Sequence, residues 1–524
     1  MSGYSDAGAS YSRRAMKGFT SKSISAQDDI DGNNGTLRQR ARMLYMSSPV
    51  ATSAINTNRT KVVGTGLSLQ SSIDSALLGM NPDKALDWKK RTESEFALWA
   101  EKKQNCDALG MNNFAALQQL ALKSWLLSGD VFALVKRADP TPANPYTLRL
   151  HLIEADRVST PHAWTSMGAT HVYKSTEGTV PKGKPGAGNK VYDGVEVDGS
   201  GQVVAYYICS GYPNGRNRQD LKWTRVKAYG SKTGLPNILH IMDAERPDQY
   251  RGVPYLAQVI EPLLQLRRYT ESELMAALVQ SFFTAWIVTE TDQTMIPINE
   301  VGQGSIAGLP SENPGDGVSD DANEYEMGPG SVTHLKAGEK IEFGNPNIPT
   351  AGFETFVKTM CRMVGSGLEL PYDVLIKEYN SSYSASRGAL LEAWAAFKMR
   401  RAWFVDDFCQ PVYELWLAEA VARGRIKAPG FFDDPLVRNA WSGASWIGPV
   451  QESLDPLKEA KAAVLMINQG IKTRTEVTME QTGGDWNSNM EQLALENAAL
   501  KEAGIDPAST SVTITTGDGD GEGD

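Results

Sequence analysis

The sequence predicts an α+β protein, because its helical and strand-like patterns lie in separate stretches of the chain. After Pro254, apolar residues recur at spacings of three and four for about thirty residues, which is the pattern of an amphipathic helix. Between Val131 and Met242, runs of β-branched and aromatic residues alternate with Gly/Pro-rich loops, which predicts strands. A second helical segment at 353–364 adds to the mixed composition.

The two helices that bracket residues 286–349 predict a stalk that ends in a cap. A helix from 255 to 285 would be about 45 Å long, too long for one small domain to cover. Between the helices the chain has three strand candidates and one acidic Gly/Pro-rich loop: 286–289, 331–335, 340–343 and 302–330. A module on a stalk indicates a component of an assembly rather than an active site.

The N-terminal half is expected to begin with a mobile arm and to continue as helices and then strands. Residues 1–35 are rich in Ser, Gly, Ala and Asp, a composition that favours disorder. Thr36 can cap a first helix. The other helices expected here are a helical segment at 50–60 and helices between 83 and 127. The expected strands are at 62–69, 131–135, 146–153, 194–208 and 238–242, with an exposed loop at 174–190.

The C-terminal part is expected to be mainly helical. One long helix should run from about Ser384 to Arg423, with a kink at Pro411, which lacks an amide and clashes with the carbonyl of Asp407. Helical patterns resume at 456–470 and 489–504. The last residues alternate Gly with Asp or Glu, which predicts a disordered acidic tail.

The charge balance is mildly acidic: 52 Lys and Arg against 62 Asp and Glu give a net charge of −10 over 524 residues. Tight, non-specific binding of nucleic acid over the whole surface needs a positive field, so this class of function is disfavoured. The charge balance still allows a protein through which DNA passes without being bound tightly. The length is enough for about three or four domains.

The four cysteines are scattered and have no CxxC spacing, which favours buried free thiols in a reducing compartment. No run of eighteen apolar residues is present, so no membrane span is predicted. The N-terminus lacks the apolar core of a secretory signal.

No motif in the sequence supports catalysis. Residues 178–184 fit GxxxxGK, but Pro185 stands where a phosphate-binding loop needs Ser or Thr to hold magnesium, and no helix is expected to follow. The five histidines show no HExxH spacing, and no nucleophile motif is present. The protein is therefore expected to be no enzyme and to hold neither metal nor cofactor.

Several short motifs, in their order and spacing, resemble the lambda type of tailed-bacteriophage portal proteins over nearly all of residues 36–504. Each motif is weak alone, but the ordered set is specific. They are Arg38-Gln39-Arg40-Ala41-Arg42, Val62-Val63-Gly64-Thr65-Gly66-Leu67, Trp88 and Trp99 before Cys106-Asp107, Phe114-Ala115-Ala116-Leu117-Gln118, Gly129-Asp130-Val131-Phe132, Arg251-Gly252-Val253-Pro254 and Ser381-Ser382-Tyr383-Ser384-Ala385-Ser386-Arg387.

The resemblance implies a homo-oligomeric ring, usually of twelve copies, at one capsid vertex of the virion, through which double-stranded DNA is packaged and ejected. Its implied partners are terminase, a head–tail adaptor and the major capsid protein, with assembly in the host cytoplasm. The implied portal fold has a mixed α/β wing, a two-helix stem, a small α/β clip, a long kinked helix and a helical crown. By similarity the parts are the flexible arm 1–35, wing 36–250, outgoing stem 251–285, clip 286–349, returning stem 350–369, tunnel loop 370–386, long wing helix 387–424, crown 425–504 and acidic tail 505–524.

The tunnel loop and the clip supply the candidate site residues. Lys377, Asn380 and Arg387 are expected to touch DNA phosphates in the channel. The alternative is that Lys377 pairs with Glu378 or Glu369 of a neighbouring copy. The clip residues expected to dock terminase or the adaptor are Asp316, Asp320 and Asp321.

Two other classes of protein stay open. One is a different ring-forming virion component such as a head–tail adaptor, although such chains are generally far shorter. The other is a nuclease or ATPase of the packaging machinery, which would need acidic clusters or a complete phosphate-binding loop.

Overall fold

A computed structural model describes residues 9–10, 14–19, 22–164, 177–213, 215, 220–282, 286–289, 339–342, 352–379, 383–451 and 456–504. The contacts divide the chain into two compact units, which are treated separately below. The larger unit contains residues 1–264 and 359–524, and the smaller contains residues 265–358. Over the described part of the chain, no helix combines the length and apolar character needed to cross a bilayer.

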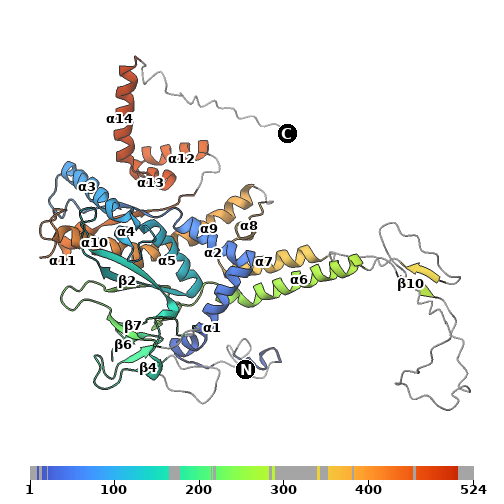
Figure 1. Ribbon diagram of the computed structural model, residues 1–524. Coiled ribbons are helices and arrows are strands. Elements are labelled where there is room, and N and C mark those ends of the chain that lie inside the picture. The colour runs from blue at the N-terminus through green and yellow to red at the C-terminus, as the bar shows by residue number, and fades with distance from the viewer. Residues whose placement is uncertain are drawn as a thin grey trace, which may run out of the picture. The chain divides into compact units, whose positions relative to one another are not determined.

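The larger unit begins with two helices that meet at Ser48 (Figure 1). These are α1 (Ala26–Ser47) and α2 (Pro49–Val62). The expectation that the first helix starts near Thr36 was wrong, because the Ser25 hydroxyl accepts from the Asp28 amide and caps the helix earlier. The expected strand at 62–69 was also wrong over most of its length. Val62 ends α2, and strand β1 covers only Ser68–Ser71.

The next part follows the predicted order of helices and then strands. The helices are α3 (Pro82–Ala100), α4 (Lys103–Cys106) and α5 (Phe114–Ser128). Strand β2 (Asp130–Arg137) is the centre of an antiparallel three-stranded sheet, between β3 (Leu148–Glu154) and β9 (Ile238–Met242). A five-stranded antiparallel sheet contains β4 (Glu177–Thr179), β5 (Lys190–Tyr192), β6 (Val195–Val197), β7 (Val203–Cys209) and β8 (Trp223–Lys227).

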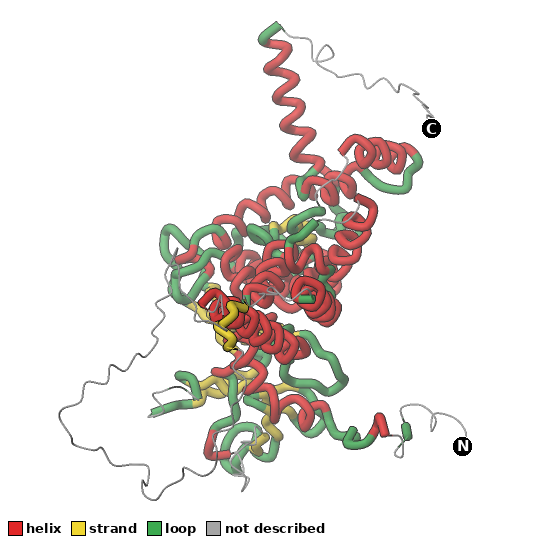
Figure 2. The backbone as a smooth tube through the Cα atoms, turned by 90° about the vertical axis from the view of Figure 1, so that its right-hand side faces the viewer, coloured by secondary structure: helices red, strands yellow, loops and turns green. Residues whose placement is uncertain are grey.

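The C-terminal part of the larger unit is helical, apart from β12 (Ala444–Ile447), which pairs with β1. The expected long helix contains a π-helical turn, Val405–Cys409, between α9 (Tyr383–Phe404) and α10 (Gln410–Ala422), close to the proline where a kink was predicted. Pro411 lies in the first turn of α10, where its missing amide costs least. The other helices are α8 (Tyr372–Ile376), α11 (Pro435–Ser442), α12 (Pro456–Asn468), α13 (Arg474–Thr482) and α14 (Trp486–Glu502). Figure 2 shows α14 extending as a straight helix beyond α12 and α13.

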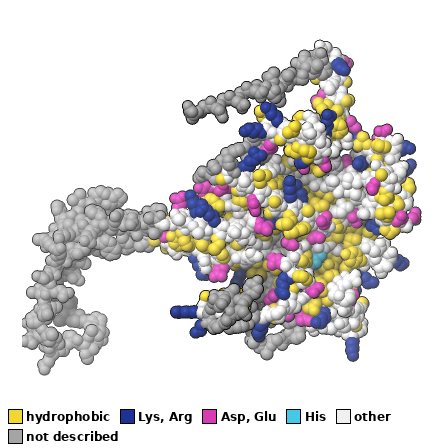
Figure 3. Space-filling model, turned by 180° about the vertical axis from the view of Figure 1, so that it is seen from behind, with side chains coloured by type: hydrophobic (Ala, Val, Ile, Leu, Met, Phe, Trp, Pro, Cys, Tyr) yellow, Lys and Arg dark blue, Asp and Glu magenta, His cyan; other side chains and the backbone are white. Residues whose placement is uncertain are grey.

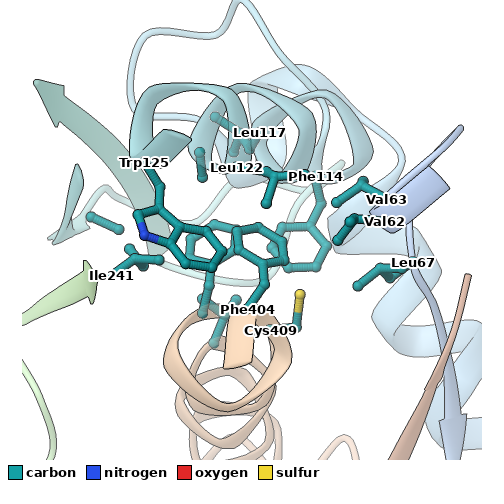
Figure 4. Packing of buried hydrophobic residues seen from close by; sticks show 14 of the residues in the cluster. Val62, Val63, Leu67, Phe114, Leu117, Leu122, Trp125, Ile241, Phe404 and Cys409 are labelled. Atoms are coloured by element: carbon teal, nitrogen blue, oxygen red, sulfur yellow. The ribbon is translucent and has the colours of Figure 1, made fainter. Parts of the chain in front are cut away.

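Aromatic residues from α3, α5 and the π-interrupted helix form the main core of this unit. Trp99 and Trp416 are fully buried, and the Phe96 ring lies edge-on to Trp416 at 5.1 Å between centroids. Figure 4 shows Phe114 facing Phe404 across this core. Burial on several sides explains why aromatic residues cover most of the circumference of α9 and α10.

The smaller unit contains parts of both predicted helices, at 265–282 and 353–358, and part of the predicted cap. The helices are α6 (Ile260–Phe282) and α7 (Phe353–Gly367), which confirms the two helical predictions. The Tyr269 ring lies 5.6 Å from Phe353 and 4.5 Å from Phe356, so the helices run side by side within this unit. Strand β10 (Trp286–Thr289) pairs antiparallel with β11 (Glu339–Glu342), close to two predicted strands. The predicted strand at 331–335 and the loop at 302–330 lie outside the described residues.

Candidate functional site

Among the described residues, an extensive set of buried ionic contacts centres on Arg251, which lies in the segment before α6. The Arg251 side chain is fully buried and forks onto the Asp130 carboxylate, with Nε 2.6 Å from Oδ2 and Nη2 3.2 Å from Oδ1. The same guanidinium donates to the carbonyls of Val158 and Ala155, both at 2.9 Å. A planar fork that serves a carboxylate and several carbonyls is a task that lysine could not perform.

Two glycines allow these segments to approach each other. A Cβ added to Gly129 would lie 2.3 Å from the carbonyl oxygen of Gly252, and one added to Gly252 would lie 1.9 Å from the carbonyl oxygen of Gly129. The Gly252 amide also donates to Asp130 at 3.2 Å. The segments Gly129-Asp130 and Arg251-Gly252 therefore depend on each other: the glycines let the two backbones touch, and this contact brings Asp130 and Arg251 together.

Helix α1 supplies a second arginine to the contacts around Asp130. Arg38 lies 3.0 Å from Asp193 and 3.6 Å from Asp130, and its Nε donates to the Ser128 carbonyl at 3.0 Å. Asn34 donates to the Gly252 carbonyl at 2.8 Å. We call the set Asp31, Arg38, Asp130, Asp193, His240 and Arg251 the buried charge cluster.

Asp130 and Asp31 in this cluster have opposite pKa shifts. Burial alone would raise the pKa of Asp130, but the charges of Arg251 and Arg38 outweigh it, and the pKa lies well below its ordinary value. Burial, together with the nearby charge of Asp193, raises the pKa of Asp31 to about 7. His240 contacts Asp130 at 3.4 Å, yet burial lowers its pKa, so its imidazole is neutral at pH 7. Two arginines thus balance two carboxylates, and Asp31 is the excess acid.

Replacing Asp31 by Asn should stabilise the protein, and the gain should grow with pH. The native carboxyl keeps its proton up to about pH 7, whereas the unfolded chain releases it near 3.8, so Asp31 favours folding less and less as pH rises between these values. Between pH 5 and pH 7 the advantage of the variant should grow by about 2 kcal/mol. Urea unfolding at both pH values measures it. The exposed substitution Asp433→Asn is the control, and an equal pH dependence in both variants would contradict the assignment.

The segment predicted to be a tunnel loop is only partly a loop. Pro371 precedes the helix α8, in which Val374 and Leu375 are buried, and α9 already begins at Tyr383. A proline before a short apolar run favours a helical turn, which the serine-rich composition further along obscured. Lys377 ends α8 in the left-handed conformation, with φ of 63°.

The structure separates the three predicted channel residues. Lys377 is exposed, and over the described residues it forms no ion pair. Arg387 lies in α9, 3.8 Å from Glu459 of α12, and its side chain is 41% exposed. Asn380 lies outside the described residues, as do the predicted clip residues Asp316, Asp320 and Asp321.

The carboxylates of the alternative pairing have partners in their own chain. Glu369 accepts from Arg400 at 2.6 Å, and Glu378 accepts from the Tyr372 hydroxyl at 2.7 Å. Each contact uses one carboxylate oxygen, and the Glu369 side chain is 57% exposed, so the alternative pairing of Lys377 with a neighbouring copy stays a prediction.

Two basic residues of α9 have structural partners that the sequence did not reveal. Arg400 is buried, donates to Asn58 at 3.0 Å and lies over the Tyr255 ring at 4.8 Å. Arg401 donates to backbone carbonyls, including that of Val62 at 2.8 Å. Both guanidinium groups are therefore engaged within the protomer.

Residues 178–184, which fit GxxxxGK, are followed by turns and a strand, as expected from the sequence in place of a phosphate-binding loop. Gly178 lies in β4, and the following residues form turns that lead into β5 rather than a helix. Among the described residues, no group of three or more His, Cys, Asp or Glu side chains is placed to hold a metal ion.

Comparison with known proteins identifies the family. The family model described as phage portal protein, lambda family, matches residues 12–401. The chain belongs to this family.

Curated relatives match over most of their length. The portal protein of Escherichia phage N15 is 23% identical over 516 residues, which cover 96% of this chain and 92% of the relative. Portal protein B of Escherichia phage lambda is 23% identical, covering 89% of this chain and 84% of the relative. A probable portal protein of Halomonas phage phiHAP-1 is 24% identical, covering 94% and 86%.

Solved structures also match this chain, with low TM-scores. The neck of a native GTA particle computed with C12 symmetry gives a TM-score of 0.39 at 12% identity, covering 85% of this chain and 92% of that chain. The virion of a native gene transfer agent particle gives 0.33 at 14% identity, covering 79% and 95%. With TM-scores this low, the family assignment rests on the sequence match.

Proposed function

We propose that this chain is the portal of a tailed phage, the head–tail connector at one vertex of the capsid. The observation that supports this function best is the family match over residues 12–401, which includes the helix pair α6 and α7. The same match does not favour a head–tail adaptor. The portal family is structural, and we propose that hydrolysis of nucleotide belongs to a separate terminase.

In this proposal, twelve copies form a ring around a passage for double-stranded DNA. Twelve copies at −10 each would give the ring a charge of about −120, which repels a duplex and favours sliding over binding. On the face in Figure 3, the described acidic and basic side chains are interspersed rather than gathered into one basic patch. Both features suit a conduit for DNA.

We assign the parts of the ring from the elements. The helices α6 and α7 are the stem, residues 286–349 are the clip, α9 and α10 form the long wing helix, and α11 to α14 belong to the crown. Residues 36–250 and the helix α1 belong to the wing. The virion is the proposed location, after assembly with the major capsid protein in the host cytoplasm.

A nonsense mutation in the gene for this chain should leave a phage unable to fill its heads. Electron microscopy of the lysate is expected to show empty heads, and expression of the chain in trans should restore DNA-filled, tailed particles. Infectious particles that lack the chain would contradict the portal function.

Deletion of residues 2–20 should leave ring formation unchanged. The deletion ends before α1, whereas a cut to residue 30 would also remove Asp29, which pairs with Arg246, and the Ile24 carbonyl, which accepts from Arg246 at 3.0 Å. Size-exclusion chromatography with light scattering measures assembly. The shorter deletion is expected to give rings of full size, and monomers from it would contradict a dispensable arm.

Reversal of Asp316, Asp320 and Asp321 to Lys should weaken docking of terminase or adaptor about tenfold while rings still form. The proposed clip lies at the end of the stem, where both partners must bind, and acidic residues there can complement a basic partner surface. A pull-down with purified terminase tests it. The acidic tail provides a matched control, since Asp518, Asp520 and Asp524 reversed to Lys should change binding little. Equal binding by the clip variant and wild type would place docking elsewhere.

A further inference from the structure

Helix α14 has no residue buried by its own chain, although it is rich in apolar side chains. Met490 is 42% exposed, Leu493 47% and Leu495 67%. A helix of this length is only marginally stable alone in water, so most of its stability must come from packing. Among the described residues, its side-chain contacts to the rest of the chain lie at its N-terminal end, where Asp485 accepts from Gln70 at 3.0 Å and Glu491 pairs with Lys90.

The apolar residues occupy two opposite faces of this helix. At about 100° per residue, Met490, Leu493 and Leu500 fall on one side. Leu495 lies about 200° from Leu493, and Ala498 and Ala499 flank it on that opposite side. We call these the Leu493 face and the Leu495 face. A helix that packs against a single partner needs one apolar face, so two opposite faces indicate two neighbours.

We propose that α14 is an interface helix between copies of this chain, in which the Leu493 face of one copy packs against the Leu495 face of the next. In a ring, each subunit presents two different surfaces to its two neighbours, which is a heterologous interface that closes on itself. Two opposite apolar faces on one helix match that geometry, whereas a two-fold dimer would bury the same face on both copies. The occupant is therefore a second copy, and the inference rests on the ring of the proposed function.

The charges beside these faces are compatible with parallel packing. Lys501 lies about 80° from Leu493, at the border of the Leu493 face, whereas Glu502 lies about 20° from Leu495, within the Leu495 face. Both are exposed in the single chain. Copies related by rotation about one axis have equal residues at equal height, so Lys501 of one copy meets Glu502 of the next. Asn497 falls on the Leu493 face, where a single polar group can fix the register of neighbouring helices.

Paired cysteines test this arrangement. We would make Leu493→Cys and Leu495→Cys singly and together, purify rings, confirm their mass by light scattering, and treat them with a short bismaleimide. The four native cysteines are buried, so they give little background. The double variant should give a ladder of covalent oligomers beyond the dimer, because each copy links to two neighbours. Neither single variant should link.

The outcomes separate this inference from the proposed function. Rings of full mass whose double variant gives no ladder would overturn the interface but leave the portal function intact. Dimers from Leu493→Cys alone would overturn it in favour of a two-fold contact. Failure of the wild-type chain to form rings would contradict the proposed function itself.

Hydrogen exchange on unmodified rings tests the same claim without a substitution. If α14 is packed between copies, its amides beyond Glu491 should exchange at least about a hundredfold more slowly than in an unstructured chain. Exchange near the rate of an unstructured chain would overturn the interface even if the cysteine variants fail to fold.

Discussion

Replacement of Arg251 by Met should destabilise the protein by about 3–5 kcal/mol and lower the yield of folded chain sharply. The change leaves the fully buried Asp130 without its bidentate partner, and it removes the hydrogen bonds from Arg251 to the carbonyls of Val158 and Ala155. Arg38, at 3.6 Å from Asp130, is too distant to replace the lost fork. Urea unfolding followed by tryptophan fluorescence measures the loss.

A matched control is available in α6. Arg267 forms an i,i+4 pair with Glu271 at 2.8 Å, but its side chain is 42% exposed, so Arg267→Met should cost less than about 0.5 kcal/mol. The double variant Asp130→Asn/Arg251→Met should be less damaged than Arg251→Met, since no unpaired charge is left at position 130. Equal stability of Arg251→Met and wild type would contradict the role given to the buried charge cluster.

Alanine at both Lys377 and Arg387 should leave rings intact and reduce heads that retain DNA by about tenfold. Each residue offers a weak phosphate contact that is independent of sequence, and ring symmetry repeats any loss in every copy. Lys377 is exposed at the end of α8, and the ion-pair partner of Arg387 among the described residues is Glu459 at 3.8 Å, so neither change removes a buried partner there. Encapsidated DNA is measured by nuclease protection.

The control for this experiment removes the same charges elsewhere. Lys84 and Arg91 lie exposed on α3, and their replacement by Ala should leave DNA retention at the wild-type level. If heads with the Lys377 and Arg387 changes package and hold full-length genomes normally, this segment is not a DNA contact. If the α3 control loses DNA equally, the effect reflects total charge instead.

Local patterns were sufficient to predict the α+β class and most elements. The spacing of apolar residues after Pro254 predicted α6, and Pro411 indicated an irregularity close to the π-helical turn. The start of α1 was missed because Gly32 and Gly35, both exposed, disfavour a helix locally, and the Ser25 cap outweighs them. Helix propensity over a few residues cannot show whether the Ser25 cap or the two glycines decides where the helix begins.

The buried charge cluster could not be predicted from sequence patterns. Arg38 and Asp193 are 155 residues apart, and Asp130 and Arg251 are 121 residues apart, so no local spacing links them. An isolated Asp or Arg in a sequence resembles a solvated side chain, and the burial of these charges follows from the tertiary packing, in which Gly129 and Gly252 let their segments approach closely. For the same reason Arg400 and Arg401 could not be distinguished from surface cations.

The most direct test of the portal function is the assembly state of the purified full-length chain. Electron microscopy of negatively stained particles, with mass measured on the same sample, is expected to show closed rings with a central hole and a mass close to twelve times 57.1 kDa. A protein that stays monomeric under conditions in which it is folded, and shows no ring at any concentration, would contradict it.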